Sequence, residues 1–329
     1  MNLRRRDLLQ IAGAAAALPI VSPTARADTS ADTYPARPVR IIVPFGAGGP
    51  SDIVTRLVGQ SLSARLGQQF IVEDRPGGSG NIGTEAVVRA APDGYTLLMV
   101  GPPNATNATL YDDLRFDFIR DIAPVALIGR VTVIMVVNPS VPAKSVPEFI
   151  AYARANPGKI DMGSAGNGTT AHMSGELFKM LAGVELVHVP YRSQAQALAD
   201  LIAGRVQVMF DTTPPYLPHI KAGELRALAV GSAKHWAAMP ELPTIAASVP
   251  GYESGGFYGF GAPRGTPSAI IGKLNAATNA SLNDATVKAR LTDLGVTALP
   301  GTPADFGKLI ADETEKWGKV IRTAHIKPE

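Results

Sequence analysis

Three glycine-rich stretches are the parts of this sequence best suited to hold a ligand. They span residues 44–52, 75–84 and 163–172, and each lies between a predicted strand and the start of a predicted helix. Glycine lets the backbone approach a ligand closely. A helix start adds unpaired N–H groups and the positive end of the helix dipole. Such a place can hold a carboxylate or a phosphate without a charged side chain.

The second stretch contains Gly78-Ser79-Gly80-Asn81-Ile82-Gly83, which fits the dinucleotide-binding pattern G-x-G-x-x-G. That pattern requires the first glycine to follow a strand directly and an acidic residue about twenty positions later, at the end of the next strand. Here residues 74–77 intervene, and the next predicted strand, residues 95–100, ends in Gly101-Pro102-Pro103. We therefore interpret these glycines as a turn and not as a nucleotide site.

The polar side chains of the other two stretches have a structural and a ligand-binding interpretation. Ser51 and Asp52 suit a helix N-cap and a first-turn acid. Thr169 and Thr170 suit the same capping role at a later helix. Either role is compatible with ligand contact, so the sequence leaves both open.

His172 and Asp211 are the two titratable candidates. His172 follows a glycine loop at a helix start, where it either contacts the ligand or makes a structural hydrogen bond. Asp211 ends the apolar run 206–210, where open α/β sheets place ligand-binding groups, and the alternative is capping of the next turn. The five histidines show no metal-ligand spacing and the chain has no cysteine. No catalytic set, metal site or cofactor is predicted.

Predicted strands alternate with predicted helices along the chain. Apolar runs predict strands at 39–43, 70–73 and 95–100, and two separate strands at 125–128 and 131–137. A last helix presents one apolar face, made of Phe306, Leu309, Ile310, Trp317 and Ile321. This alternation predicts parallel-rich sheets covered by helices.

The N-terminus has the features of a secretory signal peptide. A basic segment containing Arg5-Arg6 precedes a short apolar run and Ala25-Arg26-Ala27, which predicts a twin-arginine-like signal over residues 1–27, cleaved after Ala27, and a periplasmic protein. An uncleaved anchor is the alternative. The segment holds four of the 31 basic and one of the 28 acidic residues, so the mature chain has 27 of each. Nucleic-acid binding, which needs a basic face, is excluded.

Several motifs in combination resemble the receptors of tripartite tricarboxylate transporters, the Bug-type periplasmic solute-binding proteins. The resemblance covers essentially the whole mature chain. It rests on Pro44-Phe45 with Gly48-Gly49 and Asp52, Gly80-Asn81-Ile82-Gly83, Ala91-Pro92-Asp93-Gly94-Tyr95, Gly163-Ser164 with Gly166-Asn167-Gly168 and His172, Val187-His188-Val189-Pro190-Tyr191, Phe210-Asp211, and Pro240-Glu241-Leu242-Pro243-Thr244.

The resemblance implies an α/β fold of the two-lobed "Venus flytrap" type, each lobe a parallel-rich sheet flanked by helices. The first lobe would comprise residues 34–130 with 256–329, and the second residues 131–255. The sequence departs from the family pattern at Arg192-Ser193-Gln194-Ala195 and at the proline-rich segment Gly101-Pro102-Pro103-Asn104-Ala105. Both departures are expected in loops that could face the cleft.

The same resemblance implies a monomeric, non-enzymatic receptor that captures a small carboxylate and delivers it to integral-membrane permease subunits. The carboxylate, from a dicarboxylate, tricarboxylate, amino acid or aromatic acid, would lie between the first and third glycine-rich stretches. Two alternatives remain. One is a carboxylate lyase or hydrolase with Asp211 or His172 as its general base, and the other is a sensory receptor. The expected ligand-binding residues are Phe45, Gly48, Gly49, Ser51, Asp52, Ser164, Gly166, Thr169, Thr170, His172 and Asp211.

Overall fold

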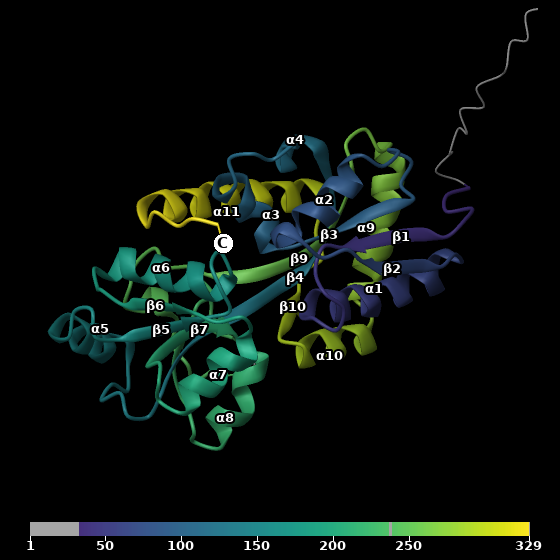
Figure 1. Ribbon diagram of the computed structural model, residues 1–329. Helices are drawn as coiled ribbons and strands as arrows, with labels where there is room; N and C mark the ends of the chain where they lie inside the picture. The colour runs from purple at the N-terminus through teal and green to yellow at the C-terminus, as the bar shows by residue number, and fades with distance from the viewer. Residues whose placement is uncertain (1–32, 237–238, 329) are drawn as a thin grey trace, which may run out of the picture.

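Two lobes lie side by side, joined by two long strands, β4 (Ile122–Val137) and β9 (Gly255–Pro263) (Figure 1). This computed structural model describes residues 33–236 and 239–328, and the predicted signal peptide lies outside them. No helix within those two ranges has the length and apolar character needed to cross a bilayer.

The first lobe is built on a mixed sheet in the strand order β2-β1-β3-β9-β4, with β10 added on β4. β1 runs parallel to β2 and β3, whereas β9 runs antiparallel to β3 and β4. Its elements are β1 (Val39–Val43), α1 (Pro50–Leu66), β2 (Phe70–Asp74), η1 (Gly78–Gly80), α2 (Asn81–Val88), β3 (Thr96–Val100), α3 (Pro102–Leu110), α4 (Phe118–Asp121), α9 (Ser268–Leu282), α10 (Ala285–Asp293), β10 (Val296–Ala298) and α11 (Pro303–Thr323).

Alternate residues of β1 and β3 serve the two faces of this sheet, as strand geometry requires. Ile41 and Leu97 pack in the core that includes α1 and α9. Ile42 and Leu98 pack in a second core that includes α2 and α11. Both faces are apolar because both are covered by helices.

The second lobe continues from the far half of β4, which pairs with β7 and β8. β5 runs parallel to β6 and β7, so the carboxyl ends of these three strands meet at one edge. Its elements are α5 (Val146–Ala155), β5 (Asp161–Ser164), α6 (Thr170–Ala182), β6 (Val187–Pro190), α7 (Gln194–Ile202), β7 (Val208–Thr212), η2 (Pro214–Tyr216), α8 (Leu217–Lys221), β8 (Arg226–Val230) and η3 (Ile245–Ala247).

The prediction of two strands at 125–128 and 131–137 is wrong, because β4 is continuous. It pairs with β9 as far as Thr132 and with β7 from Val133 onward. Gly129 does not end the strand. A Cβ at this position would lie 2.3 Å from the Thr297 carbonyl oxygen of β10, so the glycine allows close strand approach.

The proline-rich segment 101–105 is also not a loop. Pro102 and Pro103 are the first two residues of α3, where no intrahelical N–H bond is required. The Asn104 Oδ1 atom accepts a hydrogen bond of 2.9 Å from the Gly101 N–H and closes the helix start. The prolines therefore begin a helix.

The last helix, α11, has the predicted apolar face and contacts both lobes. Phe306, Ile310, Trp317 and Ile321 are buried, and α11 packs against α3 of the first lobe and α6 of the second (Figure 1).

A polar network ties α11 to the place where the chain passes between the sheets. The buried Glu313 side chain accepts a 2.7 Å hydrogen bond from the Trp317 indole and lies 3.5 Å from the Arg130 guanidinium on β4. Arg130 also pairs with Glu253, just before β9, at 2.7 Å. The network therefore joins the helix to both connecting strands.

Gly259→Ala should destabilise the fold, whereas Gly272→Ala should stabilise it. A Cβ at Gly259 in β9 would lie 2.3 Å from Phe306 and 2.6 Å from the Ala126 carbonyl oxygen, and such overpacking costs about 1–3 kcal/mol. A Cβ at Gly272, inside α9, meets nothing within 4 Å and should gain about 0.5–1 kcal/mol. Urea unfolding measures both. Equal effects would contradict the packing described for β9.

Candidate functional site

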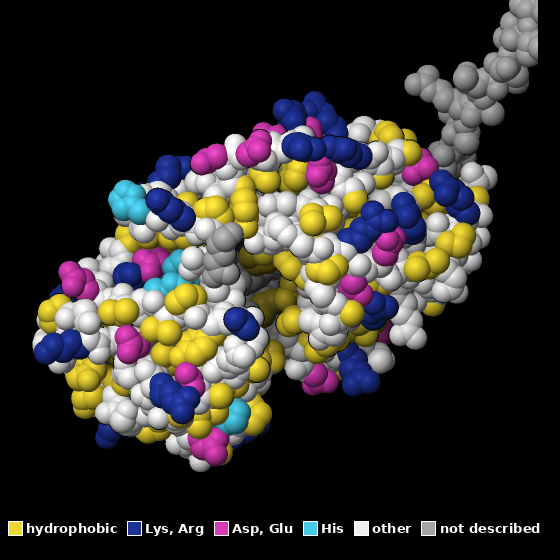
Figure 2. All heavy atoms as spheres, viewed as in Figure 1, with side chains coloured by type: hydrophobic (Ala, Val, Ile, Leu, Met, Phe, Trp, Pro, Cys, Tyr) yellow, Lys and Arg dark blue, Asp and Glu magenta, His cyan; other side chains and the backbone are white. Residues whose placement is uncertain are grey.

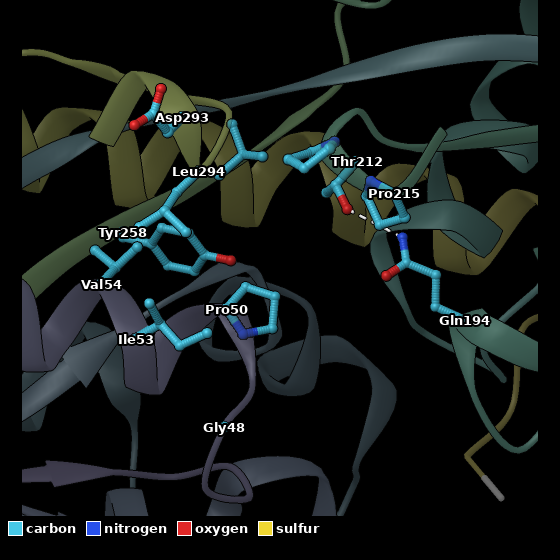
Figure 3. A pocket seen from close by; sticks show the side chains of 12 residues that line it. Gly48, Pro50, Ile53, Val54, Gln194, Thr212, Pro215, Tyr258, Asp293 and Leu294 are labelled. Atoms are coloured by element: carbon cyan, nitrogen blue, oxygen red, sulfur yellow. Dashed lines mark hydrogen bonds between the residues drawn. The ribbon is translucent and has the colours of Figure 1, made fainter. Parts of the chain in front are cut away.

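The space-filling view shows a hollow with an apolar floor between the lobes (Figure 2). A cavity of about 160 Å³, which we call the α1 cavity, takes walls from both lobes (Figure 3). The first lobe contributes Gly48, Pro50, Ile53, Val54, Tyr258, Asp293 and Leu294, β4 contributes Val131, and the second lobe contributes Gln194, Thr212, Pro214 and Pro215.

A second cavity of about 150 Å³, the α3 cavity, also has walls from both lobes. Phe45, Ser79, Pro103, Asn107 and Leu110 line it from the first lobe, and Asn167, Gly168 and Thr169 from the second. The β1–α1 loop, residues 44–49, thus contributes to both cavities through Phe45 and Gly48. The β5–α6 loop, residues 165–169, lines the α3 cavity.

The β1–α1 loop is shaped by a glycine and an internal carboxylate. Gly48 has φ +76°, a conformation that favours glycine, and its N–H donates to Asp52 Oδ2 at 2.8 Å. Asp52 also pairs with Arg56 at 2.6 Å. Asp52 is therefore a first-turn acid, as predicted, and its carboxylate holds the loop.

The prediction of Ser51 as an N-cap is wrong. α1 begins at Pro50, and Gly49 is the N-cap, with no side-chain capping bond. Proline favours the first helical position because it has no N–H to lose there, so the helix starts at Pro50 and the cap lies two residues before Ser51. Ser51 lies buried in the first turn.

The β5–α6 loop is closed by hydroxyl groups. Ser164 Oγ bonds both the N–H and the carbonyl oxygen of Gly166, and lies 2.6 Å from His188 Nε2. Gly166 has φ +111°. Thr169 is the N-cap of α6, as predicted, whereas Thr170 is the first helical residue and not a cap. The loop thus holds a compact shape at the positive end of α6.

His172 makes a structural hydrogen bond. Its Nδ1 accepts from the Gly168 N–H at 3.1 Å, and its ring stacks on His188 with centroids 3.8 Å apart. Burial, with smaller effects of His188 and Lys179, lowers the pKa of His172 to about 3. The imidazole is therefore neutral at physiological pH and accepts the loop N–H without a charge.

This depressed pKa predicts lower stability in acid. Unfolded histidine takes up a proton near pH 6.5, whereas His172 in the folded chain does so only near pH 3. Between those values the unfolded state binds more protons, so stability is lost as pH falls. At pH 5 the loss is about 2 kcal/mol. Urea unfolding at pH 7.5 and 5 should show a smaller loss for His172→Asn than for the parent. Equal losses of unfolding free energy in the variant and the parent would contradict the depressed pKa of His172.

Asp211 lies behind the α1 cavity wall with both oxygens occupied. Oδ2 accepts from Gln194 Nε2 at 2.8 Å and from the Tyr216 hydroxyl at 2.9 Å, and Oδ1 accepts from the Thr212 N–H at 2.7 Å. Burial raises the pKa of Asp211, while these donors oppose the rise. Asp211 therefore positions Gln194 and Thr212, the two residues beside it that line the cavity.

The eleven predicted residues fall into two groups. Phe45, Gly48 and Thr169 line a cavity. The others support the loops or the cavity wall, and they are Gly49, Ser51, Asp52, Ser164, Gly166, Thr170, His172 and Asp211.

Sequence reasoning missed several lining residues. Gln194 lies in a segment that departs from the family pattern, which was its only signal. Ser79 lies in the second glycine-rich stretch, which we interpret as a turn, whereas Tyr258 and Asn107 carried no signal because contacts between distant segments bring them to the cleft.

A model described as tripartite tricarboxylate transporter family receptor matches residues 54–326. The chain belongs to this family. Protein BugT of Bordetella pertussis is 35% identical to the receptor over 304 residues, covering 92% of this chain and 93% of BugT. R. palustris Rpa4515, solved with adipate, is 40% identical with a TM-score of 0.78, covering 90% of this chain and all of its own. MatC from Rhodopseudomonas palustris, solved with bound malate, is 31% identical with a TM-score of 0.74, covering 88% and 100%.

The family membership and the two-lobed α/β fold predicted for the receptor are confirmed. The receptor is a solute-binding protein and not an enzyme, so the alternative of a carboxylate lyase or hydrolase is wrong. His172 and Asp211, the two candidate bases of that alternative, both make structural hydrogen bonds.

Proposed function

We propose that this receptor is exported to the periplasm, captures a small carboxylate between its lobes and delivers it to integral-membrane permease subunits. One observation carries the proposal: two loops at helix starts, one from each lobe, line the same interlobe cavity. The carboxylate would lie between the β1–α1 and β5–α6 loops. Rpa4515 and MatC, solved with adipate and malate, support this ligand class.

The loops suit an anion without a nearby cation. Residues at the starts of α1 and α6 line the two cavities, and a helix start carries the positive dipole end and N–H groups without an intrahelical partner. Hydrogen bonds from N–H groups to an ionised carboxylate are about twice as strong as neutral ones. A few such bonds replace an arginine clamp and leave the site free of a fixed cation.

Closure of the lobes would follow from the position of the ligand. A carboxylate that contacts a loop of each lobe gains more contacts when the lobes approach, so it favours the closed state. We place the lobes at residues 34–130 with 256–329 and at 131–255. The hinge would lie where β4 changes partners between Thr132 and Val133, beside the start of β9.

Closure can be measured cleanly because the chain has no cysteine. Exposed Gln60 in α1 and Ala151 in α5 can be replaced by cysteine and spin-labelled, one label in each lobe. The interlobe distance should shorten with a bound carboxylate and stay unchanged with the corresponding amide, which has the same shape and no charge. Equal responses to acid and amide would contradict carboxylate recognition.

A further inference from the structure

The polar atoms facing the α1 cavity are mainly hydrogen-bond acceptors. Gln194 is the clearest case. Its amide nitrogen donates to Asp211 Oδ2 at 2.8 Å and to Thr212 Oγ1 at 3.2 Å. Asp211 also receives donors from Thr212 and Tyr216, so it acts as an acceptor and fixes the amide orientation. No donor among the described residues bonds the Gln194 oxygen, which points toward the cavity (Figure 3).

Several of the neighbouring donors are already committed or absent. The Gly48 N–H donates to Asp52, and the Thr212 N–H donates to Asp211. The Thr212 hydroxyl lies 3.5 Å from Asp211 Oδ1 as a donor. Three lining residues, Pro50, Pro214 and Pro215, have no N–H at all. The starts of α1 and α7, at Pro50 and Gln194, add first-turn N–H groups, so the acceptor character of this lining rests on its side chains.

Tyr258 supplies a further polar atom. Its hydroxyl points toward the middle of the cavity, between the two lobes (Figure 3). Burial and the nearby Asp211 charge raise the pKa of Tyr258, so the phenol stays protonated and uncharged. A hydroxyl can accept one hydrogen bond while donating another, so Tyr258 suits a donor on the ligand as well as an acceptor.

The charges around the cavity oppose a second anion. No lysine, arginine or histidine is among its described lining residues. Asp211 lies directly behind Gln194 with its side chain buried, and the Asp293 carboxylate at the rim points away from the centre (Figure 3). A carboxylate placed here would lose water without gaining a cation and would face the buried Asp211, so an uncharged or cationic donor is favoured over it.

The remaining lining is apolar and small. Val54, Val131 and Leu294 lie with the three prolines around a space of about 160 Å³. A cavity of roughly 150 Å³ holds a benzene-sized molecule. The space therefore suits a short aliphatic chain or one aromatic ring.

We infer that the ligand carries one carboxylate and, at the far end of a small apolar body, a hydrogen-bond donor such as a hydroxyl or an ammonium group that binds Gln194 Oε1 and Tyr258. This inference rests on the proposed function, which places the carboxylate between the two loops. It predicts a preference for hydroxylated or aminated monocarboxylates over dicarboxylates of the same length.

Two matched series test the inference by isothermal titration of the mature receptor. One is hexanoate, 6-hydroxyhexanoate, 6-aminohexanoate and adipate, and the other is benzoate, 4-hydroxybenzoate, 4-aminobenzoate and terephthalate. In at least one series, the hydroxyl-substituted or the amino-substituted monocarboxylate should bind at least tenfold tighter than the dicarboxylate. It should also bind tighter than the unsubstituted monocarboxylate. The hydroxyl and amino arms distinguish the two kinds of donor.

The other outcomes separate the two proposals. A preference for adipate or terephthalate would overturn the donor assignment and leave carboxylate capture intact. Equal affinity of the unsubstituted and donor-bearing acids would also overturn it. Absence of binding throughout both series would count against the donor assignment, and absence for every carboxylate of a broader panel would overturn carboxylate capture as well.

Two substitutions localise the effect. Tyr258→Phe removes one hydroxyl and should weaken the donor-bearing acid about tenfold while leaving the unsubstituted acid unchanged. Leu294→Arg places a cation at the cavity wall and should shift the preference toward the dicarboxylate. Unchanged preferences in both variants would show that the far end of the ligand lies outside the α1 cavity. Thermal unfolding of each variant checks that it folds.

Discussion

Gly166→Val should reduce carboxylate affinity by at least about 100-fold while the protein stays folded. Gly166 has φ +111°, and a β-branched residue there is strained by about 1–3 kcal/mol. Its carbonyl oxygen accepts from Thr169 Oγ1 at 2.8 Å, and its N–H donates to Ser164 Oγ at 3.1 Å. A moved backbone at this residue would misplace the whole β5–α6 loop. Titration with the best carboxylate measures the loss.

Gly158→Val is the matched control for that substitution. Gly158 also has positive φ, at +66°, but its Cβ position is open and it belongs to neither cavity lining. It should cost similar backbone strain and leave affinity unchanged. Retained affinity in Gly166→Val would show that the β5–α6 loop does not hold the carboxylate.

Asp211→Ala should destabilise the receptor by about 3 kcal/mol, the largest stability loss expected from one side chain described here. The substitution removes the acceptor for the Tyr216 hydroxyl, the Gln194 amide and the Thr212 N–H in a buried place. Each donor left unpaired carries its own desolvation cost. Urea unfolding at pH 7 gives the difference in unfolding free energy.

The control for Asp211 is Asp312→Ala. Asp312 pairs with Lys308 on α11, but the two side chains are 60% and 76% exposed. Exposed pairs contribute little, about 0–1 kcal/mol. Equal losses from the two substitutions would contradict the description of Asp211 as the centre of a buried network.

Much of the fold follows from local pattern. The strands at 39–43 and 95–100 were predicted within one residue, because apolar runs bounded by turns are strong signals. The break predicted inside β4 was wrong because Gly129 serves an inter-strand contact with β10, which depends on residues far away in the chain. The start of α3 was missed because two prolines suggest a loop unless they occupy the first helical turn.

The site was predictable only where its chemistry is local. Glycine loops at helix starts are visible in the sequence, and so Gly48 and Thr169 could be named. The residues that line the α1 cavity together with Gly48 could not be named. Tyr258 reaches this cavity through the pairing of β9, and Gln194 reaches it through contact between the lobes. The commitment of His172 to the Gly168 N–H and of Asp211 to Gln194 also depends on geometry that no spacing reveals.

The most direct test of the central claim is a thermal-unfolding screen of residues 28–329 against small carboxylates, with NAD as the control. A ligand at a hundred times its Kd stabilises the folded state by about 2.7 kcal/mol, or very roughly 5 °C for a chain of this size. We expect such a shift with at least one class of carboxylate and none with NAD. A shift with NAD alone would contradict carboxylate capture and would show that the 75–84 glycines bind a nucleotide after all.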